Sequence, residues 1–337
     1  MMNPESNNTL RYGTLVYGST IVLFLLLLSC GPIGHDRADQ TVAGESSDVV
    51  HYTYRVAGGE VVLMYKLQTE LAQQINRSGL ADSSIVDTLY NLNQRLWTSC
   101  LIDSPSSFRK KYGTALQEKS DAIIALATEF EALGLDSIIL TTFENIAQQS
   151  SVPFEGRYLI GFLENVGCLM CGCDNYTMVG NAYNEVYTHP DQLKILLAHE
   201  INHNFYETAK QEDPDKNTVL YNALDEGFAN LFSMQVTGAS RLEAFGMSPQ
   251  QYQWLTENED TLRGRFKQVM FSTKEEDWDP FSQKIADSVV QGSPGDVGYF
   301  IGYRIIEAWL DRNPARTWQD VYDVPVRTII EESGYLD

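Results

Sequence analysis

LLAHEINHNF, residues 196–205, contains two histidines four positions apart, with a glutamate directly after the first. At 100° per residue, His199 and His203 lie one turn apart on the same side of a helix, with Glu200 beside them. Two imidazoles in that arrangement can share a metal ion, and the neighbouring carboxylate can reach a metal-bound water. The alternative is that both histidines fill space in an acidic helix and form ordinary hydrogen bonds.

The flanking residues predict that this stretch lies within a helix. Thr188 and Asp191 match the Ser/Thr-x-x-Asp/Glu capping pattern, and Pro190 suits a first turn, so the helix should begin there. Histidines that point inward without a polar partner would be costly, which favours a metal site. Apolar residues recur every four positions on roughly the opposite side of the helix: Leu193, Leu197, Ile201 and Phe205.

A metal held by two histidines needs a third protein ligand, and a catalytic metal also needs an open position for water. No histidine follows His203, so a downstream ligand must be a carboxylate. Glu226 is the better candidate, because YNALDEGFANLFSM (221–234) has helical spacing and Gly238 as a plausible stop. Glu207 is the alternative, although a third ligand on the same helix would approach at a poor angle. Two asparagines one turn from Glu226 could hydrogen-bond the ligands from behind: Asn222 and Asn230.

HEINH followed by LDEGFA resembles the gluzincins, zinc metallopeptidases whose third ligand is a glutamate on a downstream helix. Their aminopeptidase and leukotriene A4 hydrolase branch carries a similar NEGFA. GYFIGYRIIEAWL (298–310) resembles the start of the helix on which these aminopeptidases carry a tyrosine that steadies the tetrahedral intermediate, and Tyr299 and Gly302 stand at the matching positions. The order of the motifs also resembles a family of predicted bacterial zinc-dependent proteases, some of them lipoproteins.

This resemblance implies an α+β, mostly helical fold with a zincin-like catalytic region and a small sheet beside the HExxH helix. It implies one catalytic Zn²⁺ with Glu200 as the general base and Tyr299 as the donor to the developing oxyanion, Tyr303 being the alternative. The Gly-x-Met-Glu-Asn motif of the aminopeptidases is missing upstream of the zinc helix, so exopeptidase specificity is not implied. The implied zinc ligands are His199, His203 and Glu226.

These features together predict an exported zinc metallopeptidase that hydrolyses peptide bonds of a peptide or protein substrate through a metal-activated water. Two other functions remain open. One is a catalytically silent envelope lipoprotein that binds or scaffolds a partner. The other is a zinc hydrolase of non-peptide bonds.

The N-terminus predicts export and lipid anchoring. TLVYGSTIVLFLLLLSCGPIG (14–34) is apolar, follows Arg11 and is short for a transmembrane helix, which suits the hydrophobic region of a signal peptide. Its LLSC tail resembles a bacterial lipobox, in which Cys30 becomes the lipidated first residue of the mature chain. A signal anchor and an ordinary signal peptide are the alternatives. We therefore expect a lipoprotein signal peptide (1–29), a tether (30–50) and a location in the bacterial cell envelope, attached to the membrane through the lipid.

The net charge limits the classes of binding partner, and the cysteines must be interpreted in the light of the predicted export. The net charge of −21 argues against nucleic-acid binding, because no basic stripe is present to displace counterions from phosphate. In an exported protein, disulfides are the default state of the remaining cysteines, with free thiols and a second, structural zinc site as alternatives. These cysteines are Cys100, Cys168, Cys171 and Cys173.

The remaining sequence predicts a helical N-terminal region (51–150) and a zincin-like catalytic region (151–337). Apolar residues recur at helical spacing in three segments of the first region: 61–75, 83–97 and 119–134. In the second region, 157–163 and 184–189 are the strand candidates. The strand nearest the metal would offer a free edge on which an extended peptide could pair.

Overall fold

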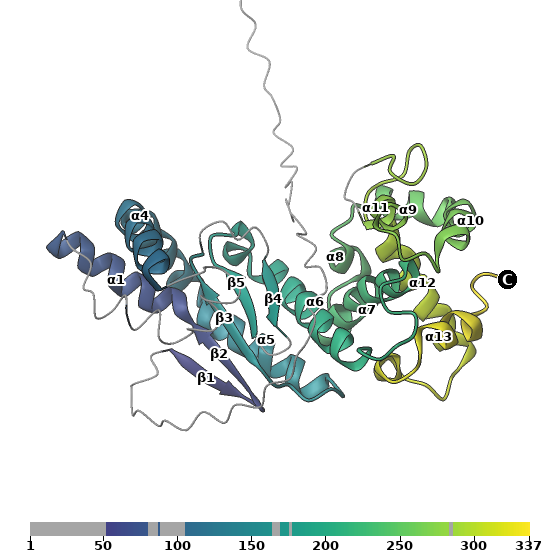
Figure 1. Cartoon of the computed structure of the whole chain (residues 1–337), viewed down its shortest axis with the longest axis horizontal. Helices are drawn as coiled ribbons and strands as arrows, with labels where there is room; N and C mark the ends of the chain where they lie inside the picture. Colours follow the sequence, from purple (N-terminus) through teal and green to yellow (C-terminus); the bar gives the residue numbers. More distant parts are fainter. Residues whose placement is uncertain (1–51, 80–86, 88–104, 164–168, 175–176, 283–285) are drawn as a thin grey trace, which may run out of the picture.

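The computed structural model describes residues 52–79, 87, 105–163, 169–174, 177–282 and 286–337. A sheet with its covering helices forms one side of the molecule, and a group of helices forms the other (Figure 1). No helix in these ranges is both long and apolar enough to cross a bilayer. The predicted α+β class, mostly helical with a small sheet, is confirmed.

Five strands form a mixed sheet in the order β1-β2-β3-β5-β4. β1 (Thr53–Val56) and β2 (Gly59–Leu63) make an antiparallel hairpin. β3 (Arg157–Gly161) runs parallel to β2 and to β5 (Thr177–Asn181), and β4 (Met170–Asp174) pairs antiparallel with β5 at the edge. Because β2 and β3 pair, residues on both sides of the predicted boundary at 150 contribute to one sheet.

Helices cover both faces of this sheet. On one face, a Cβ added to Gly161 of β3 would lie 2.4 Å from the Met64 side chain, so the first helix packs closely there. On the other face, the Tyr158 ring packs edge-on against Phe143, with 5.1 Å between the ring centroids. Because both faces are covered, β3 and β5 are almost continuously buried. The helices on this side of the molecule are α1 (Met64–Ser78), α4 (Pro105–Leu133), α5 (Leu135–Gln149) and α6 (Pro190–Ala209).

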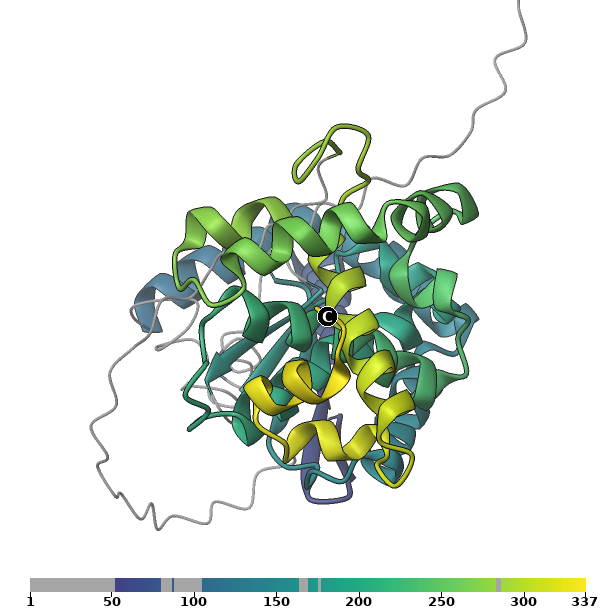
Figure 2. The ribbon, with the colours of Figure 1, turned by 90° about the vertical axis from the view of Figure 1, so that its right-hand side faces the viewer.

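The C-terminal helices stand in front of the sheet when the molecule is viewed from that end (Figure 2). α7 is the most buried of them, because it contacts α6 and α12. These helices are α7 (Val219–Thr237), α8 (Arg241–Phe245), α9 (Pro249–Glu257), α10 (Glu259–Val269), α11 (Glu275–Ser282), α12 (Val297–Arg312) and α13 (Val326–Ser333), and two 3-10 helices lie at η2 (Glu185–Thr188) and η3 (Trp318–Tyr322).

The backbones of α7 and α12 touch where two glycines meet. A Cβ added to Gly302 would lie 1.6 Å from the carbonyl oxygen of Ala223. A Cβ added to Gly227 would lie 2.1 Å from the backbone nitrogen of Tyr303. No side chain fits at either position without a shift of the backbone, so this contact fixes α12 on α7.

Several local predictions differ from the structure. α6 begins at Pro190 with His189 as its N-cap, because the Thr188 hydroxyl donates to the carbonyl of Glu185 inside η2. The predicted strand 184–189 is this 3-10 helix. The predicted helix 61–75 starts only at Met64, after β2 has ended. Residues 1–51, with the predicted signal peptide and Cys30, lie outside the described residues, as does the predicted helix 83–97 apart from Asp87.

Candidate metal centre

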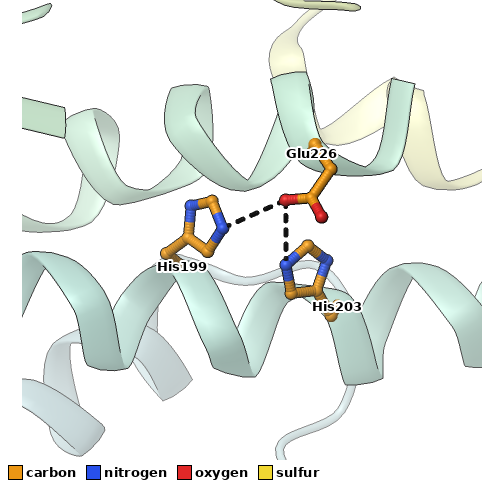
Figure 3. A group of neighbouring side chains, drawn as sticks. All are labelled: His199, His203 and Glu226. Carbon is orange, nitrogen blue, oxygen red and sulfur yellow. Dashed lines mark ion pairs between the residues drawn. The ribbon is translucent and has the colours of Figure 1, made fainter. Parts of the chain in front are cut away.

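Two helices bring the predicted ligands together. His199 and His203 project from α6 and Glu226 projects from α7, and the three side chains point toward one another (Figure 3). Oε2 of Glu226 lies 3.3 Å from Nε2 of His199 and 3.4 Å from Nε2 of His203. Two ligands bound at ~2.0–2.1 Å to a tetrahedral zinc are about 3.3 Å apart. The described residues therefore contain a cluster whose spacing fits a shared metal ion.

Two further side chains hold the histidines from behind. Nδ1 of His203 donates to Oδ1 of Asp225 over 2.9 Å, and Nδ1 of His199 donates to Oδ1 of Asn230 over 3.1 Å. An imidazole that donates from Nδ1 presents a lone pair at Nε2, which is the arrangement of metal-binding histidines. Both Nε2 lone pairs therefore face the Glu226 carboxylate.

The centre of the cluster needs a positive charge. Oε2 of Glu226 is buried and has no hydrogen-bond partner. Three acceptor atoms that converge without a proton between them repel one another, and burial makes the missing partner more costly. A divalent cation would satisfy all three atoms at once, and two imidazoles with one carboxylate are ligands that zinc accepts.

Without a metal, the electrostatics favour a proton in its place. Burial lowers the pKa of the His203 imidazole, but the carboxylates of Asp225 and Glu226 outweigh burial and hold that pKa well above its ordinary value. Burial likewise raises the pKa of Glu226, and the two histidines outweigh it and hold that pKa far below its usual range. The metal-free cluster is therefore an ion pair between a protonated His203 and the Glu226 carboxylate.

The free energy of unfolding of the metal-free protein should fall as the pH rises above about 6.5, the pKa of an unfolded histidine. Because the folded pKa of His203 is raised, its contribution is complete below that value and is lost as the pH rises through the folded pKa. Denaturant titrations at several pH values measure the effect. Asp225→Asn removes one of the charges that raise this pKa and should flatten the dependence, so an equal slope in both proteins would contradict the explanation.

The other predicted site residues have separate surroundings. The Tyr299 ring lies parallel to the His199 ring, with 6.1 Å between centroids. Burial, then the charge of Glu226, raises the pKa of Tyr299 well above its ordinary value. The charge of Glu200 also acts on Tyr299. In contrast, the Tyr303 hydroxyl donates to Glu307 over 3.0 Å and accepts from Arg241 over 2.8 Å, and Glu207 is exposed outside the cluster.

Asp225 is the site residue that the sequence analysis missed. Asn230 was expected to support the ligands, but the acid directly before Glu226 in LDEGFA was not assigned a role. Asp225 stands one residue before Glu226 on α7, so its side chain points about 100° away from that of Glu226 around the helix axis. It therefore reaches His203 and not the metal position. Two adjacent acids facing a histidine pair were the available signal.

The structure describes the bonding state of one of the four predicted disulfide cysteines. Cys171, in edge strand β4, is disulfide-bonded. The side chains of Cys100, Cys168 and Cys173 are outside the described part of the chain, so their pairing stays a prediction.

Comparison with known proteins places the chain in a different functional context. A family model described as gliding motility protein GldB matches residues 168–337, which is half of the chain. The matched part contains α6, α7 and α12, and so the complete metal cluster. No curated protein and no solved structure matches the chain.

The family match shows that the metallopeptidase prediction is wrong. The matching family is that of a gliding motility protein, not the gluzincins or the predicted zinc-dependent proteases. The predicted hydrolase activity is withdrawn, together with the peptide substrate, the general base at Glu200 and the oxyanion donors at Tyr299 and Tyr303. The zincin-like part of the fold prediction has no support from a known structure. The predicted envelope location agrees with a lipoprotein family.

Proposed function

Since this chain belongs to the gliding motility protein GldB family, we propose that it is a lipid-anchored envelope lipoprotein that serves gliding motility by binding or scaffolding a partner, without turnover. The observation that carries this proposal is the match over residues 168–337. The LLSC sequence that ends at Cys30 supports the anchor. The alternative of a silent lipoprotein fits the family better than any enzyme does.

We also propose that His199, His203 and Glu226 hold one divalent metal ion, Zn²⁺, in a structural role. The ligand separations of 3.3 and 3.4 Å and the unpartnered Glu226 oxygen support it. When bound, the ion would supply the positive charge that the converging acceptors need, and it would cross-link α6 to α7. His199 and His203 would be oriented for this by Asn230 and Asp225.

Complementation of a gliding bacterium that lacks this gene tests the functional proposal. Wild type should restore gliding. Cys30→Ser should accumulate as a larger precursor that carries no lipid and should fail to restore gliding, because neither processing nor lipid attachment can occur. Cell fractionation with immunoblotting, and gliding speed, are the measurements.

Glu200→Gln is the control that separates a binding protein from an enzyme. It should restore gliding as wild type does, since the proposed role requires no proton transfer to this carboxylate. Loss of gliding at a normal protein level would count against a function without turnover. A Cys30→Ser protein of the same size as wild type would show that residues 14–29 are not removed and serve as a signal anchor.

A further inference from the structure

The metal cluster is almost fully shielded from solvent. The side chains of His199, Glu226 and His203 are 10%, 14% and 22% exposed. A catalytic metal keeps a position open for water or substrate, whereas a structural metal is enclosed by protein. A neighbouring side chain must therefore cover the side from which a ligand would enter.

Tyr299 is the neighbouring side chain best placed to cover it. Its ring lies parallel to the His199 ring at 6.1 Å between centroids and 10° between planes. The charge of the Glu226 carboxylate acts on its phenol. The phenol therefore lies against the first histidine on α6 and close to the glutamate on α7.

α12 cannot move away from the cluster without breaking tight contacts on both sides of Tyr299. One turn after Tyr299, the backbone at Gly302 touches the backbone of α7. Directly before it, a Cβ added to Gly298 would lie 2.7 Å from the Trp278 ring. Tyr299 is thus held between two close contacts that leave no space for α12 to shift.

We propose that Tyr299 closes the metal site to ligands from solution, so that the ion joins helices and does not meet a substrate. This inference rests on the proposed metal centre and deepens it. Tyr299 is a positioning residue here, because it lies against His199 and close to Glu226 and does not itself bind the ion. The closed site accounts for motifs of a hydrolase type in a family of motility lipoproteins.

Cobalt in place of zinc provides a spectroscopic test, because its visible absorption reports each change in its ligands. The full-length lipoprotein in detergent is loaded with Co²⁺ and titrated with azide. The wild-type spectrum should stay unchanged. Tyr299→Ala should bind azide at least ~10-fold more tightly than wild type, a difference of about 1.4 kcal/mol. Tyr299→Phe keeps the covering ring and should remain closed.

Tyr303→Phe is the matched control, because it removes a hydroxyl from the same helix that contacts Arg241 and Glu307. It should leave the cobalt site closed. Azide that binds wild type as tightly as it binds Tyr299→Ala would overturn the closure and leave the metal centre intact. A change in the wild-type spectrum on addition of azide would decide this even if the alanine variant fails to fold. A closed site in Tyr299→Ala would show that another group covers the metal. Failure of wild type to bind Co²⁺ would overturn the metal centre itself.

Discussion

Gly302→Ala should lower the free energy of unfolding by about 3 kcal/mol or more, which is at the upper end for an added methyl group. The new Cβ would lie 1.6 Å from the carbonyl oxygen of Ala223, and backbone atoms cannot rotate away as a flexible side chain can. α12 would have to separate from α7, which would expose the apolar surface that the two helices bury. Denaturant titration of both proteins measures the difference.

Gly264→Ala is the control for this experiment. Gly264 lies within α10, is exposed, and has no atom within 4 Å of an added Cβ. Alanine there should stabilise the protein by about 0.5–1 kcal/mol, because it favours the helix. Gly227→Ala should behave like Gly302→Ala, since its Cβ would meet the backbone of the facing helix. A Gly302→Ala protein as stable as wild type would show that the two helices are not in backbone contact.

Removal of the metal should also lower the free energy of unfolding by a large amount. An ion present at about a thousand times its dissociation constant stabilises the folded state by about 4 kcal/mol. His203→Ala and Glu226→Ala should lose the bound metal, and the melting temperature of each should no longer respond to a chelator. Wild type should contain about one equivalent of zinc and should melt at a lower temperature once chelated. Metal analysis and thermal melts provide the measurements.

His189→Ala is a matched control for the loss of a histidine. His189 caps the same helix α6, lies almost three helical turns before the first histidine of the cluster, and its Nδ1 lies 3.0 Å from the carbonyl oxygen of Glu185. It should keep the metal and the response to the chelator. Zinc retained in Glu226→Ala would move the third ligand to another residue, with Glu207 the next to replace. Metal-free wild-type protein would contradict the centre altogether.

The part of the site that depends on helical spacing could be predicted from the sequence. A four-residue interval puts His199 and His203 on one side of α6 whatever surrounds that helix. Gly238 ends α7 in the left-handed conformation, as expected for a glycine stop. Glu226 followed from the absence of later histidines and from the helical spacing of 221–234.

Other parts depend on tertiary contacts, which spacing does not encode. The short strands β4 (MCGCD) and β5 (TMVGN) contain cysteine, glycine and polar residues and show no clear strand pattern. Their pairing is visible only in the folded sheet. Gly302 was noted as part of a local motif, but its close contact with α7 and with Gly227 emerges only from the crossing of α7 and α12. Residues 184–189 have the composition of a strand, yet Asn184 caps a 3-10 helix by accepting from the Val186 amide.

The error in function has a physical explanation as well. A short histidine–glutamate pattern and a downstream glutamate specify where three donor atoms meet, and that geometry serves a structural ion as well as a reactive one. Whether a reaction occurs depends on access to the ion. Access is decided by Tyr299, a residue of another helix almost a hundred positions further along the chain.

The pairing of β2 with β3 has a consequence for how the chain folds. Glu60 of β2 lies in register with Arg157 of β3, so the N-terminal hairpin can join the rest of the sheet only after a strand that follows α1, α4 and α5 is in place. Closing so long a loop is entropically unfavourable before the contacts it brings are made, which slows folding. Until β3 is in place, the exposed edge of β2 can pair with another chain, so binding by a chaperone during this interval should reduce aggregation.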